Sequence, residues 1–373
     1  MKALILSCNT GGGHNSAAKA IAEELHSHGD EACVLDYLCL ASKKVSKIVG
    51  DGYVQIVKKT PLLFGLIYKL GKFISRITKK SPVYYINGRM AKYLYEYLKE
   101  NPADVLIMPH LYPAETITYM KRKGMPLPPT IAVMTDYTCI PFWEETDCDY
   151  YILPHEALRK SCVKRGIPNE KIQTFGIPVA KKCRLNISKE DARKSLGLNL
   201  DQKYFLLAGG SMGAGDFVEL VEKLVFRTTT EQILAVCGNN KKAEKKLKKQ
   251  FKEEPRVIVL GYTEQMPLYL SACDVLFTKP GGLTSTEAAV VGVPIIHTAP
   301  IPGCETINRR FFMRSGMSWT AITILGQVRR GIRLMNNPEA QKKMVERQAK
   351  QIHGDAVEKL YDFITQQVKE HQS

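Results

Sequence analysis

The chain has 373 residues, of which 45% are hydrophobic and 24% charged, and its formal net charge is +16. This length suits two domains of ordinary size, and the apolar content is too high for an intrinsically disordered protein. The excess of Lys and Arg favours anionic partners, such as phosphorylated substrates, an anionic membrane surface or nucleic acid.

Ten cysteines occur without a CxxC pair or a Cys/His spacing typical of a zinc site, so we interpret them as reduced thiols of a cytosolic protein. The first residues superficially match a lipoprotein signal, but the apolar run is short and Asn9 follows at once. The longest apolar runs, such as 62–68, are far below the roughly 20 residues that span a bilayer. The sequence therefore predicts a soluble or peripheral protein.

Residues 2–35 are predicted to form a strand, a glycine-rich loop, a helix from about Ser16 and a second strand. The loop lacks a full GxGxxG pattern, which disfavours a classical dinucleotide site. Three successive glycines, including Gly12 and Gly13, allow close approach of a ligand. A tight turn is the alternative, but two glycines suffice for a turn. We therefore favour a functional loop with His14 at the mouth of the helix.

Residues 42–99 carry thirteen Lys or Arg against two acidic residues, and apolar residues interleave them at largely helical spacing. Basic amphipathic helices with aromatic residues can lie on an anionic membrane face. An ordinary helix pair with a solvated basic face explains the pattern almost equally well, whereas RNA binding lacks an accompanying signature. The candidate membrane or acceptor contacts are Lys58, Lys59, Phe64, Lys69, Lys72, Phe73 and Arg76.

Two further strands are predicted over 104–108 and 130–134, and they are followed by His110 and Asp136. Ligands of open α/β sheets collect at the carboxyl ends of the strands, where both side chains are expected. An Asp after a strand is equally well explained as a helix cap or turn residue. The residues alone leave these two interpretations of Asp136 open.

Asp147 and Asp149 form a DxD tripeptide, a pattern that can bind a divalent metal bridging the phosphates of a sugar nucleotide. The tripeptide is common by chance, and here it directly precedes a predicted strand over 150–153. We therefore predict no metal site. A helix over 155–165 and a strand near 173–175 complete this half of the chain.

A turn at 176–178 marks the exit from the first half. We predict one domain over 1–178, a second over 179–354, and a C-terminal helix over 355–373. In the second domain, glycine turns follow three predicted strands, at Gly209, Gly261 and Gly281. These turns are expected at one edge of a parallel sheet, which suits a nucleoside diphosphate.

The stretch 273–297 is a strand, a glycine turn, a helix from about Thr284 to Gly292, and a second strand. A glycine turn that leads into a helix exposes backbone N–H groups and the positive end of the helix dipole, which favours a phosphate. Glu287, expected in the first turn of this helix, can accept hydrogen bonds from ribose hydroxyls.

Three motif blocks are jointly specific: TGGGH at 10–14, TKPGG-T--EA at 278–288 and IPG-E--N at 301–308. Together they resemble the glycosyltransferase family of monogalactosyldiacylglycerol synthases and bacterial processive diacylglycerol glucosyltransferases. The peptidoglycan GlcNAc transferase is a more distant relative. The resemblance covers nearly the whole chain. It implies an α/β GT-B fold, with two Rossmann-like parallel-sheet domains facing across a cleft and the C-terminal helix packing back on the first domain.

The resemblance also implies metal-independent, inverting transfer of a hexose from a UDP-sugar to diacylglycerol or a related lipid, at the inner face of the cell membrane. Asp136 matches the catalytic base. His14 is the second candidate catalytic residue, and with Gly12 and Gly13 it matches the side of the acceptor or an anionic lipid, so a lipid-binding role is its alternative. No cofactor besides the donor and no nucleic acid partner are expected. The implied donor-binding residues are Gly210, Ser211, Met212, Gly261, Tyr262, Met266, Gly281, Gly282, Thr284, Glu287, Gly303, Glu305 and Asn308.

Two departures from the family pattern leave alternatives open. Cys304 stands where the family commonly has Gln, and the chain lacks the His-Pro often found after Asp136. Cys cannot donate an amide hydrogen bond, so glucose and galactose both remain candidates. The other hypotheses are transfer to another lipid, such as a polyprenyl diphosphate-linked sugar, a GT-B-fold UDP-sugar epimerase, and a basic nucleic-acid-binding protein without enzymatic role.

Overall fold

A computed structural model describes residues 1–8, 11–78, 80–209 and 217–372, without the side chains at 53, 54, 57–59, 61, 62 and 76. The chain forms two compact units. Unit 1 comprises residues 1–181, 302–304 and 354–373, and unit 2 comprises residues 182–301 and 305–353. The sequence placed the boundary after Pro178 and did not separate residues 302–304 from the second domain.

Unit 1 is built on a six-stranded parallel sheet in the order β2-β1-β3-β4-β5-β6. The order reverses between β1 and β3, which is where ligands bind in open α/β sheets. The strands are β1 (Lys2–Ser7), β2 (Glu31–Asp36), β3 (Val105–Met108), β4 (Thr130–Val133), β5 (Tyr150–Ile152) and β6 (Ile172–Gln173). The helices are α1 (Gly12–Ser27), α2 (Lys43–Lys59), α3 (Pro61–Ile77), α4 (Pro82–Gly88), α5 (Ala91–Glu100), α6 (Leu111–Arg122), α7 (Arg159–Arg165) and α16 (Ala356–Gln372).

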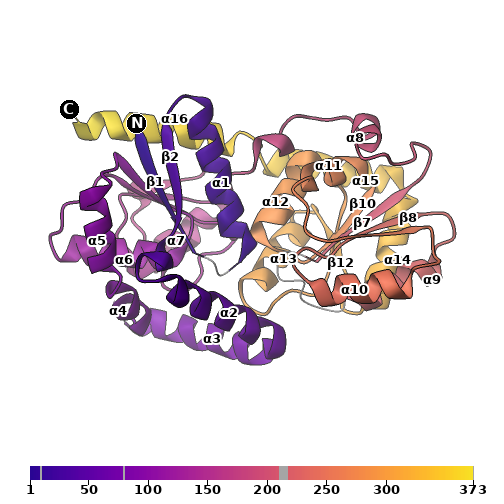
Figure 1. The fold of residues 1–373 in the computed structure, drawn as a ribbon, viewed down its shortest axis with the longest axis horizontal. Coiled ribbons are helices and arrows are strands. Elements are labelled where there is room, and N and C mark those ends of the chain that lie inside the picture. Colours follow the sequence, from indigo (N-terminus) through magenta and orange to yellow (C-terminus); the bar gives the residue numbers. More distant parts are fainter. Residues whose placement is uncertain (9–10, 79, 210–216, 373) are drawn as a thin grey trace. The chain divides into compact units, whose positions relative to one another are not determined.

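The core of unit 1 is formed by short strands buried on both faces, as is typical of a parallel sheet covered by helices. Helices α1 and α16 lie side by side on this sheet (Figure 1). Four apolar residues of α16 belong to the same core as β1, β3, β4 and β5. The last helix of the chain therefore completes the hydrophobic core of unit 1. The buried α16 residues are Val357, Leu360, Ile364 and Val368.

The glycine loop before α1 is shorter than the sequence suggests. We expected a loop through His14 and a helix from about Ser16, but α1 begins at Gly12. Glycine is costly in a helix interior but is tolerated in the first turn, where the N–H groups have no intrahelical partner. The prediction of a loop at Gly12 and Gly13 was wrong, and His14 lies within the first turn of α1.

Unit 2 repeats the architecture, with a parallel sheet in the order β12-β11-β10-β7-β8-β9. The order reverses between β7 and β10. The strands are β7 (Tyr204–Ala208), β8 (Gln232–Val236), β9 (Val257–Leu260), β10 (Val275–Thr278), β11 (Ile295–His297) and β12 (Trp319–Thr320). The helices are α8 (Lys189–Ser195), α9 (Phe217–Arg227), α10 (Lys241–Gln250), α11 (Met266–Ala272), α12 (Gly282–Val291), α13 (Cys304–Arg314), α14 (Ile324–Met335) and α15 (Pro338–Gln351).

Helix α12 begins at Gly282, two residues before the expected start at Thr284. Gly281 precedes it in an extended conformation, and Glu287 lies in the second turn, not in the first as predicted. Gly292 ends the helix with a φ of 81°, a left-handed conformation that favours glycine. The expected end of this helix is confirmed.

Helix α14 packs against the sheet of unit 2 through a glycine. A Cβ atom at Gly331 would lie 2.1 Å from Cζ of Phe277, a side chain of β10 that is 1% exposed. The absence of a side chain at residue 331 therefore determines how closely α14 approaches β10. Among the described residues, no helix is both long enough and apolar enough to cross a membrane.

Candidate functional site

The carboxyl ends of β1, β3 and β4 surround a pocket of about 280 Å³ in unit 1. His14, His110 and Asp136 follow these three strands and line the pocket. The sequence predicts this edge of the sheet for His110 and Asp136, and the mouth of the helix for His14. The other lining residues are mostly apolar. They include Phe64, Ile67, Leu111, Met134, Ile140, Phe142 and Trp143. A few polar groups in an apolar hollow are typical of a small-molecule site.

His14 is held in one orientation by its Nδ1 atom. This nitrogen lies 2.8 Å from the carbonyl oxygen of Pro109 and 2.8 Å from Oγ1 of Thr135. A carbonyl can only accept, so Nδ1 carries the proton of the neutral ring and Nε2 is left as an acceptor. Burial lowers the pKa of His14, although the Asp136 carboxylate opposes this effect. His14 is therefore a neutral hydrogen-bond acceptor near pH 7.

His110 supports this arrangement. Its ring packs edge-on against the ring of His14 with 4.5 Å between centroids, and its Nδ1 accepts a hydrogen bond from the N–H of Tyr112. Burial, followed by the neighbouring His14, lowers the pKa of His110 well below its usual value. Two neutral imidazoles therefore stand beside the Asp136 carboxyl.

Phe142 forms part of the pocket wall in a strained backbone conformation. Its φ is 79°, a left-handed value that is rare for a bulky residue. The Phe142 ring lies so close to α3 that a Cβ at Gly71 would be 3.3 Å from its Cε2 atom. Backbone strain of this kind persists where the surrounding structure enforces it, which is common at functional sites.

Helix α3 forms part of the pocket wall and has two different faces. Phe64, Ile67 and Tyr68 line the pocket, whereas Leu66 and Phe73 are 62% and 60% exposed. Phe64 is therefore a pocket residue, while the predicted contacts Phe73, Lys69 and Lys72 are exposed on α3. The side chains of Lys58, Lys59 and Arg76 lie outside the described part of the chain. Further exposed apolar residues of α3 are Leu63, Leu70 and Ile77.

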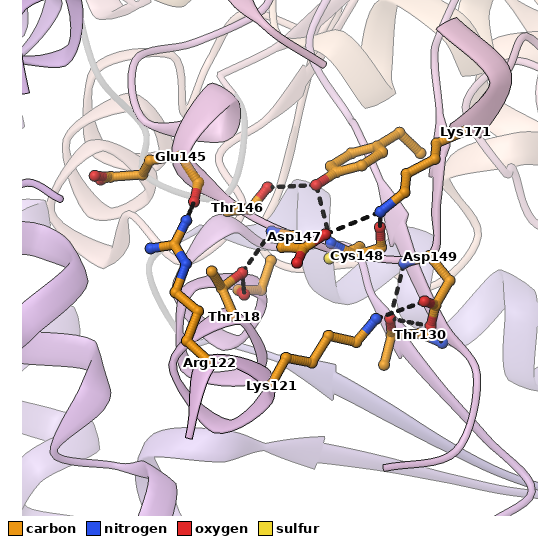
Figure 2. Close-up of polar contacts among 12 residues, drawn as sticks. Thr118, Lys121, Arg122, Thr130, Glu145, Thr146, Asp147, Cys148, Asp149 and Lys171 are labelled. Atoms are coloured by element: carbon orange, nitrogen blue, oxygen red, sulfur yellow. Dashed lines mark hydrogen bonds and ion pairs between the residues drawn. The ribbon is translucent and has the colours of Figure 1, made fainter. Parts of the chain in front are cut away.

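The two acids of the DxD tripeptide are engaged by lysines (Figure 2). Lys121 Nζ lies 2.5 Å from Oδ1 of Asp149, and Lys171 Nζ lies 2.9 Å from Oδ1 of Asp147. Burial opposes ionisation of Asp149, but hydrogen bonds from Lys121 and Thr130 lower its pKa. The tripeptide precedes β5 and so stands at the amino ends of the strands, away from the pocket. Its acids connect α6, β4 and the start of β6.

In unit 2, the turn between β10 and α12 is braced by two of the predicted donor residues. Glu305 accepts hydrogen bonds from Lys279 Nζ at 2.5 Å and from the N–H of Ile301 at 2.8 Å. The Nδ2 atom of Asn308 donates to the carbonyl of Pro280 at 3.1 Å. Both side chains are buried. They hold the turn that leads to Gly281 and the start of α12, where backbone N–H groups can meet a phosphate.

Thr284 lies in the first turn of α12. Five of the predicted donor residues therefore surround this turn and the start of the helix: Gly281, Gly282, Thr284, Glu305 and Asn308. Glu287 lies one turn further on. Gly303 differs, because it groups with unit 1. Gly261, Tyr262 and Met266 lie at the carboxyl end of β9 and the start of α11, with Tyr262 62% exposed. Gly210, Ser211 and Met212 lie outside the described residues.

Two residues of unit 2 support α12 but were not identified from the sequence. His297, fully buried at the end of β11, lies with Nε2 3.0 Å from Oγ of Ser285 on α12. Burial lowers the pKa of His297 to about 3, so the ring stays neutral. Lys279 is paired with Glu305. Neither role could be read from spacing, because each depends on a partner in another element.

Burial raises the pKa of Glu287 to about 7. If its carboxylate accepts hydrogen bonds from a ribose, the affinity for UDP-glucose should rise roughly tenfold between pH 6 and pH 8, as the carboxyl ionises. Calorimetric titration with UDP-glucose measures this, because its diphosphate does not titrate in that range. Glu287→Gln should bind weakly with no pH dependence. An unchanged pH slope in this variant would exclude Glu287 as the titrating group.

Comparison with known proteins matches a family model to each half of the chain. The family model for monogalactosyldiacylglycerol (MGDG) synthase matches residues 14–179, and that for group 1 glycosyl transferases matches residues 188–351. The processive diacylglycerol beta-glucosyltransferase of Bacillus pumilus is 30% identical over 315 residues, which are 83% of this chain and 80% of the relative.

Solved structures show the same fold at low identity. MurG of Acinetobacter baumannii is 14% identical, with a TM-score of 0.60 over 98% of this chain and 99% of its own. The UDP-GlcNAc 2-epimerase of Neisseria meningitidis, bound to UDP-GlcNAc, is 13% identical and has a TM-score of 0.60. The match covers 98% of this chain and 100% of the epimerase chain.

Two parallel six-stranded sheets of this kind form a GT-B fold, which the UDP-GlcNAc 2-epimerase shares. The family models and the relatives place the chain among the glycosyltransferases of this fold. The chain belongs to the family of processive diacylglycerol glucosyltransferases. The expected fold class, family and hexosyltransferase activity are confirmed.

Proposed function

We propose that this enzyme transfers a hexose, with inversion, from a UDP-sugar to the hydroxyl of diacylglycerol, and that it does so at an anionic membrane surface on the cytoplasmic side. The observation that carries the proposal is the unit 1 pocket, where Asp136 and a neutral His14 lie in an otherwise largely apolar hollow. An apolar acceptor with one reactive hydroxyl fits such a site. The name of the Bacillus pumilus relative supports diacylglycerol as the acceptor, and the similar epimerase structure, which holds UDP-GlcNAc, supports a UDP-sugar as the donor.

The chemistry requires a base for the acceptor hydroxyl and stabilisation of the departing UDP. Asp136 is the proposed base, because its carboxyl lines the pocket and follows β4 at the carboxyl edge of the sheet. The neutral His14 offers Nε2 as a second hydrogen-bond acceptor. In unit 2, the N-terminus of α12 offers backbone N–H groups to the diphosphate, and Lys279 and Glu305 fix the preceding turn.

The decisive experiment incubates the purified protein with labelled UDP-glucose or UDP-galactose and vesicles that contain diacylglycerol. We expect a labelled glycolipid with one of the donors. The absence of glycolipid with both donors would contradict the proposal, and lipid-independent conversion of the UDP-sugar would indicate an epimerase instead. The same assay determines the donor sugar.

The exposed apolar face of α3 is proposed to contact the membrane. Leu66, Leu70 and Phe73 are 56–62% exposed, and Lys69 and Lys72 lie among them. Replacing the three apolar residues with Ser should lower partitioning into anionic vesicles at least tenfold, because burial of even one such side chain contributes about 1.5–3 kcal/mol. Vesicle sedimentation measures this, and UDP affinity should not change.

Phe226 provides a matched control for this experiment, because it is 84% exposed at the end of α9 in unit 2. Phe226→Ser should leave vesicle binding unchanged. Binding should also weaken with added salt, since each near-surface cation contributes about 1 kcal/mol. Equal partitioning of the triple variant and the parent protein would remove α3 from the membrane contact.

A further inference from the structure

Tyr68 connects α3 with the short segment 302–304 of unit 1. Gly303 has a φ of 117°, and a Cβ atom there would lie 3.0 Å from Cδ2 of Tyr68. The ring therefore packs directly on the Gly303 backbone, where a Cβ atom would crowd it and where the positive φ favours glycine. This contact fixes the ring from one side and keeps Tyr68 within the pocket wall.

Tyr68 lines a pocket whose other lining residues are mostly apolar, and it carries a phenol hydroxyl. Asp136 and Cys304 line the same pocket. Burial first, and then the neighbouring Cys304 and Asp136, raise the pKa of Tyr68 above its usual value. The phenol therefore stays protonated at neutral pH, and it can donate a hydrogen bond but cannot serve as a base.

On the basis of the proposed function, we propose that Tyr68 positions the acceptor, by donating a hydrogen bond to an oxygen of the lipid's glycerol so that the hydroxyl to be glycosylated faces Asp136. The glycerol end of such a lipid carries ester oxygens beside its hydroxyl, and these oxygens can only accept hydrogen bonds. A neutral donor fixed by packing on Gly303 suits them without competing for the proton that Asp136 removes.

The placement of Tyr68 on α3 has a further effect on the acceptor. Leu66 and Leu70, two residues before and after it, are exposed on the face proposed to meet the membrane. The helix that touches the lipid phase thus also carries the group that receives the glycerol end. Tyr68 accordingly belongs to acceptor binding, while donor binding depends on residues of unit 2.

The test compares Tyr68→Phe with Tyr93→Phe. The first variant removes only the hydroxyl and keeps the ring on Gly303; the second removes a hydroxyl from an exposed ring on α5, outside the pocket. For Tyr68→Phe we expect a roughly tenfold higher KM for diacylglycerol, with UDP-glucose affinity and Tm unchanged. Tyr93→Phe should match the parent protein in all three. A structural role alone would lower Tm and would not act selectively on the KM of the acceptor.

A binding measurement makes the inference independent of turnover. Trp143 lines the pocket, so its fluorescence should report the binding of a short-chain diacylglycerol. Weaker binding by Tyr68→Phe than by Tyr93→Phe supports the inference even if no sugar is transferred, in which case the proposed function fails and the positioning role stands. Equal lipid binding and equal KM in the two variants would overturn the inference, whatever the catalytic activity.

Discussion

Asp136→Asn is expected to lower the turnover number by roughly 10²–10⁴-fold, the range in which a general base contributes to catalysis. Asn keeps the shape of Asp and one acceptor oxygen, but its amide cannot take the proton of the acceptor hydroxyl. Glycolipid formation from a labelled UDP-sugar measures this effect. The affinity for UDP should change less than twofold, because Asp136 lies in unit 1 and the proposed donor residues of the α12 turn lie in unit 2.

His14→Gln is the companion variant for this experiment. It removes the imidazole that accepts hydrogen bonds in the pocket but leaves Asp136 in place. We expect a smaller loss of turnover than for Asp136→Asn. Near-normal turnover of Asp136→Asn, combined with a large loss for His14→Gln, would reverse the roles and make His14 the base.

Gly331→Val should lower the free energy of unfolding by about 3 kcal/mol, at the upper end of the usual cost of overpacking a core. Even the first carbon of the new side chain would lie 2.1 Å from Cζ of Phe277, a side chain that is packed in the core and only 1% exposed. Either α14 must shift or Phe277 must leave its rotamer. Thermal unfolding followed by circular dichroism measures the loss as a fall in Tm of several degrees.

A matched glycine variant separates this packing effect from helix propensity. Gly52 lies within α2, and a Cβ there meets no other atom within 4 Å. Gly52→Ala should therefore be neutral or stabilise the protein by up to about 1 kcal/mol. A Gly331→Val protein as stable as the parent would show that the contact between α14 and β10 adjusts freely.

Much of this fold follows from local pattern. Short runs of Val, Ile and Leu followed by glycine turns are sufficient to predict two parallel sheets, and Gly292 marks a helix end because it takes a left-handed conformation. Helix starts at glycines are harder to predict. Gly12 and Gly282 resemble loop residues by propensity, yet both begin helices, because the first turn tolerates glycine.

The candidate site also contains residues that local sequence could predict and residues that it could not. Asp136 could be predicted because it follows a strand closely, and His14 because it stands where the glycine segment after the first strand meets a helix. The sheet brings the carboxyl ends of both strands together. Tyr68 could not be predicted, since its function depends on packing against Gly303, more than two hundred residues away. The ion pairs of the DxD tripeptide could not be predicted either, because Lys121 and Lys171 approach Asp149 and Asp147 only in the folded chain.

The core of unit 1 is discontinuous along the chain, because its sheet lies within residues 2–173 and α16 packs on that sheet from the C-terminal end. The residues that α16 contributes are Val357, Leu360, Ile364 and Val368. During synthesis, unit 2 can therefore complete its core while that of unit 1 still waits for its last helix. A fragment ending at residue 181 would expose the apolar strip that α16 covers, and would tend to aggregate. Separate expression of the acceptor half would need α16 joined back to it through a linker.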